Sequence, residues 1–205
     1  MGDDRWLTEH VSRETIEKLE TYQALLEKWS PKINLVAKST ISDAWTRHIV
    51  DSAQVFFLRP DGAKRWADIG SGAGFPGLVC AVLAAEIAPE IEFHLIESDQ
   101  RKCAFLRTVV RDLGLSAKVY AQRIDSMENL NADVVSARAL APLGPLLELV
   151  ACHLAPSGSA LLMKGARFED EMAEAQSKWR FKHEAIPSKT DDNAVVLRIG
   201  DLKRD

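Results

Sequence analysis

The spacing of apolar residues changes its character near residue 64. Before that point apolar residues recur three and four positions apart, which predicts amphipathic helices; after it, short apolar runs alternate with further helical stretches. The first helix is predicted to run from a Ser12 cap to about Trp29, ended by Pro31, and the second from about residue 42 to Phe57. Residues 1–11 lack this pattern and predict a loose tail.

The rest of the chain predicts an α/β fold. Alternating strands and helices indicate βαβ units on a mostly parallel sheet with helices on both faces. After a charged helix at 167–176, apolar runs at 178–187 and 194–199 predict an antiparallel carboxy-terminal hairpin. We expect a single domain, 1–205, with a helical extension at 12–57 and an α/β core at 64–205. The remaining strands are predicted at 65–69, 91–97, 117–121, 132–136 and 158–163, with helices at about 75–87, 99–113 and 142–153.

A glycine-rich turn follows the first predicted strand. Gly72, Gly74 and Gly77 fit the pattern G-x-G-x-x-G, with Gly70 in front and an apolar helix pattern behind. Such glycines let a ligand approach the bare backbone, so this context favours a nucleoside-containing cofactor over a purely structural turn. Glu97 ends the second predicted strand, where a carboxylate can accept from both ribose hydroxyls, and we expect it to be exposed without a ligand.

Composition and charge narrow the class of protein. With 46% hydrophobic and 27% charged residues, the chain has a globular composition, and no apolar run approaches the roughly 18 residues of a membrane span. The net charge of −4 argues against indiscriminate nucleic-acid binding but allows a local basic face. The three cysteines suit neither a disulfide framework nor a zinc site, and the chain starts without a basic and apolar leader. We therefore expect a cytoplasmic protein without a metal.

Three classes of function fit these residues. A nicotinamide-dependent dehydrogenase uses the same strand, turn and ribose-binding acid, but it also needs a substrate lobe, for which little chain remains. An S-adenosylmethionine-dependent methyltransferase needs only one sheet, and its turn commonly has the acid-x-Gly-x-Gly form seen at Asp68–Gly72. The third class is a non-catalytic RNA-binding or ribosome assembly module, because fold alone does not fix function.

Six short segments resemble the glucose-inhibited division protein B family. The most specific are the Gly-Phe-Pro-Gly ending of the glycine turn, residues 74–77, and the Arg-His-x-x-Asp-Ser segment at 47–52. The resemblance spans about residues 15–200. It implies a Rossmann-like class I methyltransferase that uses S-adenosylmethionine to methylate N7 of a guanine in small-subunit (16S) ribosomal RNA. The segments are Asn34-Leu35, Arg47–Ser52, Asp68–Gly77, Lys102–Arg107, Arg138-Ala139 and Lys164-Gly165.

Two departures from the family pattern concern contacts to the target. Family members often have Asn-Leu-Thr, where this chain has Val36 in the third position, and Ser-Arg-Ala-Phe, where it has Ala137 and Leu140 at the ends. The implied partner is small-subunit ribosomal RNA or the small ribosomal subunit, and we expect a monomer that contacts no membrane.

The resemblance also implies a cofactor site. In it Glu97 binds the ribose hydroxyls and the Ile124–Asp125 pair meets the adenine, where Asp125 can accept from the exocyclic amine. Asp125 also fits the alternative of a helix N-cap. The implied cofactor-binding residues are Asp68, Gly70, Gly72, Gly74, Phe75, Glu97, Ile124, Asp125 and Arg138.

Cationic side chains are the candidates for handling the target. Guanine N7 has a free lone pair at neutral pH, so no base is needed, and we expect Arg138 or Lys164 to steer the guanine through its O6. The alternative for both is a structural ion pair, and for His48 a structural histidine. The amino-terminal helices are expected to present RNA contacts and to supply none of the cofactor loops. The candidate RNA-binding residues are Lys32, Asn34, Arg47, His48, Arg101 and Arg123.

Overall fold

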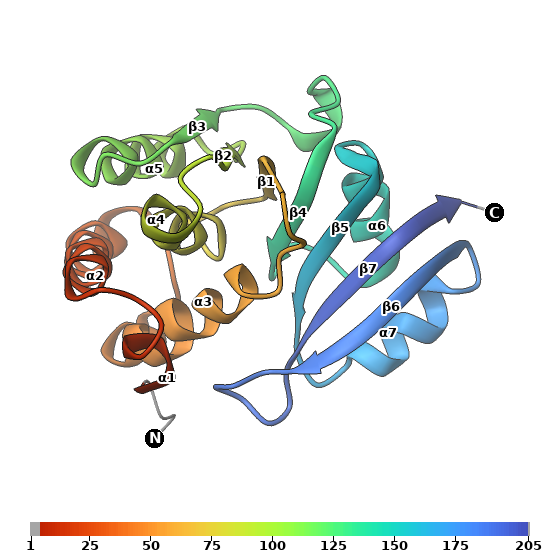
Figure 1. The fold of residues 1–205 in the computed structure, drawn as a ribbon, viewed down its shortest axis with the longest axis horizontal. Helices are drawn as coiled ribbons and strands as arrows, with labels where there is room; N and C mark the ends of the chain where they lie inside the picture. The colour runs from red at the N-terminus through yellow and green to blue at the C-terminus, as the bar shows by residue number, and fades with distance from the viewer. Residues whose placement is uncertain (1–4, 205) are drawn as a thin grey trace.

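A computed structural model describes residues 5–204 of the chain. Its centre is one seven-stranded sheet in the order β3-β2-β1-β4-β5-β7-β6 (Figure 1). The first five strands in that order are parallel, and β7 pairs antiparallel with both β5 and β6. The expected α/β sheet with an antiparallel carboxy-terminal hairpin is confirmed. The strands are β1 (Arg65–Ile69), β2 (Glu92–Ile96), β3 (Ala117–Tyr120), β4 (Ala132–Arg138), β5 (Leu154–Lys164), β6 (Trp179–Pro187) and β7 (Val195–Arg204).

Helices cover both faces of the sheet because side chains along each strand alternate between the two faces. Trp66 and Val134 belong to a core shared with the amino-terminal helices, α4 and α5, whereas Ala67 and Val135 belong to a second core with α6 and α7. Figure 1 shows these two groups of helices on opposite faces of the sheet. Helix α4 is apolar on all sides and buried along most of its length, as expected for a helix between the sheet and other helices. The core helices are α4 (Gly77–Ile87), α5 (Gln100–Asp112), α6 (Leu143–Ala151) and α7 (Phe168–Ala175).

The amino-terminal segment differs from its prediction in two places. Residues 5–8 form helix α1 (Arg5–Thr8) with Leu7 fully buried, so they are not a loose tail; residues 1–4 lie outside the described residues. Helix α2 (Arg13–Ile33) is capped by Ser12 as predicted, but it continues through Pro31. Proline fixes φ at a value that a helix accepts and removes a single hydrogen bond, so near the end of α2 it does not break the helix. Asn34 ends it instead, in the left-handed conformation at φ 51°.

The second predicted helix is divided into three parts. A 3₁₀ turn at Lys38–Asp43 is followed by a π-helical turn at Trp45–Val50 and then by helix α3 (Asp51–Phe56). The wide π-helical turn contains Arg47 and His48, and such turns are frequent at functional sites.

The amino-terminal helices belong to the main core. Leu19, Tyr22 and Leu26 of α2 are fully buried in the same apolar cluster as Leu78 of α4 and Phe105 of α5. Burial of this many large side chains stabilises the fold by about 1.5–3 kcal/mol for each. The extension is therefore packed as part of the α/β unit. Within residues 5–204, no helix is long and apolar enough to cross a membrane.

Candidate active site

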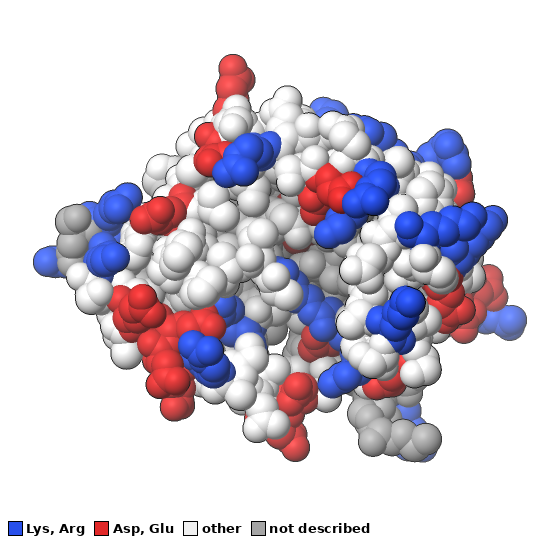
Figure 2. Space-filling view, turned by 180° about the vertical axis from the view of Figure 1, so that it is seen from behind, with Lys and Arg blue, Asp and Glu red and all other residues white. Residues whose placement is uncertain are grey.

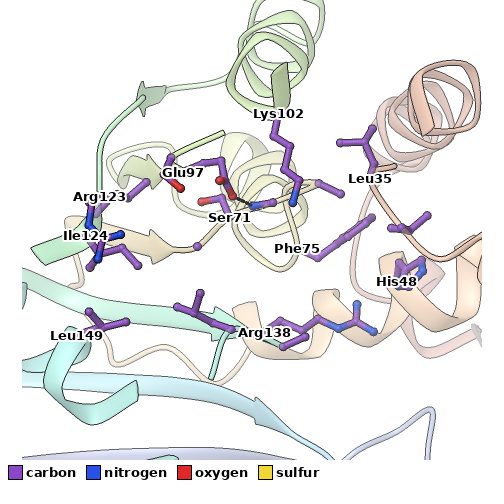
Figure 3. Close-up of a pocket in the computed structure, with 18 of the residues that line it drawn as sticks. Leu35, His48, Ser71, Phe75, Glu97, Lys102, Arg123, Ile124, Arg138 and Leu149 are labelled. Atoms are coloured by element: carbon purple, nitrogen blue, oxygen red, sulfur yellow. Dashed lines mark hydrogen bonds between the residues drawn. The ribbon is translucent and has the colours of Figure 1, made fainter. Parts of the chain in front are cut away.

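Two cavities adjoin at the carboxyl ends of the parallel strands. The first cavity has a volume of about 630 Å³ and the second about 600 Å³. Thr40, His48 and residues 138–140 line both, so the end of β4 forms the wall between them. The first cavity is also lined by residues 35–37, most of the glycine turn, Glu97, Lys102 and residues 122–125 (Figure 3). The second is also lined by Arg47, Asp51, Gln54, residues 141–142, residues 163–165, Glu171, Ser188, Thr190, Asp191 and residues 194–196.

The glycines of the turn serve two different purposes. Gly70 and Gly72 line the first cavity, and a side chain on Gly72 would meet only the Gly70 carbonyl, at 3.7 Å. Gly74 does not line either cavity. A Cβ at Gly74 would lie 2.4 Å from Leu78 and 2.7 Å from the Tyr22 hydroxyl, so this position requires glycine for packing. Gly72 therefore exposes backbone to a ligand, whereas Gly70 lets the Leu140 side chain approach, because a Cβ there would lie 2.6 Å from it. Gly74 lets α2 and α4 approach.

Glu97 braces the glycine turn from the end of β2. One carboxylate oxygen accepts the Gly72 N–H at 2.9 Å (Figure 3). The other accepts the Asp99 N–H at 2.8 Å. The residue is only 9% exposed, so the expectation that Glu97 is exposed without a ligand is wrong. A carboxylate has about four acceptor positions, and two remain after these bonds are made. Glu97 can thus hold the turn and still accept bonds from a ligand in the first cavity.

Asp68 lies beneath the turn and does not line either cavity. Its carboxylate accepts the Ser136 hydroxyl at 2.6 Å, and Ser136 accepts the indole N–H of Trp66 at 2.8 Å. Asp68 is fully buried, and burial raises its pKa to about 6, opposed by the Ser136 hydrogen bond. The structure therefore gives Asp68 a role in joining β1 to β4, through Ser136, beneath the cavity.

Residues 123–125 form the far wall of the first cavity. Ile124 and Asp125 begin a short 3₁₀ turn that no helix follows, so the N-cap alternative for Asp125 is wrong. Arg123 donates to both Asp125 oxygens at 3.2 Å and lowers the pKa of that exposed carboxyl. The fully buried His153 ring lies with Nε2 2.9 Å from the Ile124 carbonyl and fixes the turn from behind.

The amino-terminal helices and the loop after α2 form a third wall of the first cavity. Tyr22 donates its hydroxyl to the Ala73 carbonyl of the glycine turn at 2.6 Å, and residues 35–37 line the first cavity. The His48 ring stacks on Phe75 at 5.1 Å between centroids (Figure 3). The amino-terminal segment therefore lines the same cavity as the glycine turn, although the sequence pattern predicted no contribution from it there. The cause is a long-range contact, which local sequence patterns do not show.

His48 is a neutral group in this site. Burial, together with the nearby charges of Arg138 and Arg47, lowers its pKa to about 4. Its Nε2 lies 2.9 Å from the Thr40 hydroxyl, and Nδ1 is buried without a hydrogen-bond partner among the described residues. At neutral pH His48 therefore offers hydrogen bonding and a ring face, and it does not contribute the positive charge expected of a basic RNA contact.

Arg138 stands at the junction of the two cavities. Its Nη2 donates to the Arg47 carbonyl at 2.6 Å and lies 3.1 Å from an Asp51 oxygen. The ion pair proposed as its structural alternative is thus present. Its Nη1 is buried and has no hydrogen-bond partner among residues 5–204. The next residue, Ala139, has a left-handed conformation at φ 50°, a strained backbone of the kind that clusters at functional sites.

Asp51 connects Arg138 to the carboxy-terminal hairpin. Its other oxygen accepts hydrogen bonds from Gln54 at 2.8 Å, from Ser188 at 3.1 Å and from Thr190 at 2.7 Å. Ser188 and Thr190 lie in the loop between β6 and β7. This network fixes the floor of the second cavity with groups from three distant parts of the chain.

Lys164 lines the second cavity and not the first. It ends β5, donates to the Ala141 carbonyl at 3.0 Å and lies 2.5 Å from Glu171 of α7. The ion pair considered as its structural alternative is present here too. Glu171 also accepts the Leu143 N–H at 2.8 Å, at the start of α6. The pair therefore joins β5, α6 and α7 beside the second cavity.

The candidate RNA-binding residues divide into two groups. Arg47 lines the second cavity, Arg123 lines the first and His48 lines both. Lys32 lies outside both cavities, Asn34 caps α2, and Arg101 pairs with Asp99 at 3.0 Å. The back of the molecule has charges of both signs interspersed, with basic side chains in and beside a central hollow (Figure 2). The structure thus brings only part of this group to the cavities.

Five residues that shape the site are not among the candidate site residues predicted from the sequence. Lys102 lines the first cavity, and Tyr22 and His153 brace it through hydrogen bonds. Asp51 and Glu171 pair with the two cations of the second cavity. Asp51 lies within the resembling segment at 47–52 and Lys102 begins the one at 102–107, so these segments were the available signal for both. Among residues 5–204, no group of three His, Cys, Asp or Glu is arranged to hold a metal.

Solved structures share this fold at low sequence identity. The cofactor-bound protein Rv0187 from MTB has a TM-score of 0.63 and 11% identity, with 90% of each chain covered. An S-adenosylmethionine-dependent methyltransferase from Aquifex aeolicus has a TM-score of 0.58 and 14% identity, with 77% of this chain and 92% of that chain covered. The sheet order, the glycine turn and the acid after β2 define a Rossmann-like class I methyltransferase fold.

Comparison of sequences identifies the family, which the shared fold does not. The chain belongs to the rRNA small subunit methyltransferase G family, whose model matches residues 15–196. A relative of that name from Ruegeria pomeroyi is 48% identical over 197 residues, covering 96% of both chains. Another, from Rhodospirillum centenum, is 52% identical over 192 residues, covering 94% of this chain and 87% of the relative. The family expected from the six resembling segments is confirmed.

Proposed function

We propose that this protein transfers a methyl group from S-adenosylmethionine to N7 of a guanine in small-subunit (16S) ribosomal RNA. The observation that carries the proposal is the pair of adjoining cavities, which meet at Arg138 and Ala139. One offers bare backbone and an acid at the end of β2, and the other is lined by charged side chains. Relatives about 50% identical over nearly their whole length bear the name ribosomal RNA small subunit methyltransferase G.

The first cavity fits the cofactor. Glu97 keeps two acceptor positions for the ribose hydroxyls, and the Gly72 backbone lies open beside it. Ile124 offers an apolar surface to the adenine, and Asp125 an acceptor to its exocyclic amine. Asp68 and Gly74 do not line the cavity, so we assign them to the support of the turn. When bound, S-adenosylmethionine supplies a methyl group activated by its positively charged sulfur.

The chemistry asks little of the protein beyond alignment. The N7 lone pair forms the new carbon–nitrogen bond as the carbon–sulfur bond breaks, and the bonding pair stays on sulfur. No proton leaves N7, so no general base is required. The protein's residues act by holding donor and acceptor in line and by excluding water. Arg138 lies at the junction with its Nη1 unpaired, where it can orient the incoming base.

We further propose that the protein acts in the cytoplasm as a monomer of one domain. The packing of α2 and α3 into the main core supports the single domain. Basic residues beside the cavities, Arg47 and Arg123, are the best supported contacts to RNA phosphate. Such contacts are expected to weaken with salt and to be indifferent to sequence.

The test is mass mapping of ribosomal RNA from cells that lack this protein. We expect one 7-methylguanosine to be missing from the small-subunit RNA and to return when the purified protein and S-adenosylmethionine are added. Calorimetry with S-adenosylmethionine and NAD addresses the first alternative, since binding of NAD alone would favour a dehydrogenase. An unchanged map, with no transfer to free RNA, subunits or precursors, would favour a non-catalytic assembly module.

A further inference from the structure

Lys164 and Glu171 form a fixed pair in the wall of the second cavity. Lys164 is 9% exposed and Glu171 is 19% exposed, so both side chains are held mostly inside the protein. Their charged atoms are 2.5 Å apart. The Leu143 N–H at the start of α6 and the Ala141 carbonyl hold the pair from behind. The pair is therefore preorganised, and it faces the space next to the proposed methyl donor.

One of the three N–H donors of the Lys164 ammonium has no partner in the described part of the protein. An ammonium group has three donors and no acceptor. One proton goes to the Ala141 carbonyl at 3.0 Å and one to Glu171 Oε2. The third has no hydrogen-bond partner among residues 5–204. Lys164 thus offers a single donor to an occupant of the second cavity.

Glu171 has one unused oxygen. Its Oε2 takes both the Lys164 proton and the Leu143 N–H at 2.8 Å. Its Oε1 has no hydrogen bond to any described residue. A carboxylate oxygen accepts up to two hydrogen bonds. Glu171 therefore offers two acceptor positions directly beside the free donor of Lys164.

We propose that the Lys164–Glu171 pair reads the Watson–Crick edge of the acceptor guanine, a proposal that rests on the proposed function. Guanine presents the O6 acceptor next to the N1–H and N2–H donors. Lys164 donates to O6, and Glu171 Oε1 accepts from N1–H and N2–H. Enzymes that modify a base commonly read this edge after taking the base out of its stack.

The pattern selects guanine over adenine. Adenine presents an amine donor where guanine has O6, and an acceptor where guanine has N1–H, so it meets the pair with donor against donor and acceptor against acceptor. N7 lies on the other side of O6 from N1, so the recognition leaves N7 free to attack. Apolar side chains that can cover the faces of a base line the same cavity: Leu140, Pro142, Met163, Val195 and Val196.

The test is a double-mutant cycle that combines a change of the target base, from guanosine to inosine, with the change Glu171→Gln. Small-subunit RNA is assembled by ligation with guanosine or inosine at the mapped target, in the form that the wild type methylates. Inosine keeps N7, O6 and N1–H and lacks only the N2 amine. We expect inosine to lower kcat/KM of the wild type about tenfold, as for loss of a hydrogen bond to a charged group. In Glu171→Gln we expect at least tenfold slower transfer to guanosine and a guanosine-to-inosine ratio near one.

Glu169→Gln is the matched control. Glu169 is exposed on the same helix, two residues away, and does not line the second cavity. We expect its rates and its guanosine-to-inosine ratio to equal those of the wild type. A ratio that stays at the wild-type value in Glu171→Gln would reduce the pair to a structural brace.

Two further arms keep the test decisive if Glu171→Gln does not fold. Equal rates of the wild type on guanosine and inosine would by themselves overturn the proposal. A 7-deazaguanosine target tests the proposed function separately, because it lacks N7 but keeps the edge read by the pair. Methylation of that base would contradict N7 as the acceptor and would leave the guanosine-to-inosine comparison intact.

Discussion

The two cavities are of similar size but are built in different ways. The first is held by backbone: Glu97 accepts the main-chain N–H groups of Gly72 in the glycine turn and of Asp99 after β2, and Tyr22 donates to a main-chain carbonyl of the turn. The second is held by side-chain ion pairs, Arg138 with Asp51 and Lys164 with Glu171. Backbone bonds define one fixed shape. Paired side chains keep unused donors and acceptors, and such groups can read a base.

The difference between the two cavities has a chemical reason. The cofactor is the same in every turnover, so a site that exposes main chain and one acid is sufficient for it. The acceptor has to be one base among four, and discrimination between bases needs donors and acceptors in a fixed order. Burial of ion pairs contributes little net stability, so the pairs of the second cavity are better explained by specificity.

The largest effect is expected from Arg138→Ala. This change removes the group at the junction of the cavities and leaves Asp51, which is 13% exposed, without its cation. We expect methyl transfer to fall at least about 100-fold, the scale for loss of a positioned charged donor. Unfolding free energy should fall by about 1–3 kcal/mol. Transfer assays and urea unfolding measure the two effects.

Arg111→Ala is the control for this variant, because Arg111 is an exposed arginine on α5 that pairs with Asp112 at 2.8 Å. We expect it to match the wild type in both assays. Full transfer by Arg138→Ala would show that its ion pair is purely structural and would remove the junction from the mechanism.

Glu97→Ala should act on cofactor binding and on the fold together. The cofactor loses a charged acceptor worth about 1.5–3 kcal/mol, and the N–H groups of Gly72 and Asp99 lose theirs. We expect affinity for S-adenosylmethionine to fall by about one to two orders of magnitude and unfolding free energy by about 1–3 kcal/mol. Calorimetry and chemical denaturation are the measurements. Wild-type affinity in a folded Glu97→Ala protein would exclude the ribose contact.

Asp68→Asn tests the buried support of the first cavity through pH. The pKa of Asp68 is about 6 in the folded protein and lower when unfolded, so the folded state holds the proton more tightly. Stability from this group is present at low pH and is lost as pH rises through about 6. The asparagine variant has no such loss. We expect its stability relative to the wild type to improve by about 1–3 kcal/mol between pH 4.5 and 7.

Urea unfolding at several pH values measures this difference. A stability difference that stays constant from pH 4.5 to 7 would show that Asp68 does not titrate in the folded protein in this range. Ser136→Ala serves as a comparison, because it removes the hydrogen bond that opposes the raised pKa and should move the transition to higher pH.

Tyr22→Phe should have the smallest effect and addresses the amino-terminal helices. It leaves the Ala73 carbonyl without its hydroxyl donor, which costs about 1 kcal/mol of stability. We expect cofactor affinity to fall several-fold, because the turn lining the first cavity loosens. Thr21→Ala, on the exposed side of α2, is the control and should leave affinity unchanged. An unchanged affinity in Tyr22→Phe would show that the helices only cover the sheet.

The sequence predictions were accurate where structure depends on local patterns and inaccurate where it depends on contacts between distant residues. Strand and helix positions in the α/β core depend on local patterns, and most strands lie within two residues of their predicted bounds. The exceptions are β5, which begins at Leu154 and not at 158, and β7, which continues to Arg204 beyond the predicted end at 199. The glycine turn is also local, so its place in the first cavity was predictable. The burial of Glu97 and the contacts of Tyr22 and His153 depend on residues far apart in the chain, which no single-sequence pattern records.

The second cavity was less predictable for the same reason. Arg138 and Lys164 could be named as candidates, but their partners Asp51 and Glu171 lie on other elements. Helix α2 shows the limit of a local rule, since Pro31 lies inside it near its end.

A crystal structure with S-adenosylhomocysteine, the cofactor without its methyl group, tests the division between the cavities most directly. We predict that the ligand fills the first cavity, with both ribose hydroxyls about 2.5–3.0 Å from Glu97 and its sulfur directed toward the junction at Arg138. The second cavity should stay open to the acceptor base. A ligand in the second cavity, or a ribose out of reach of Glu97, would contradict the account.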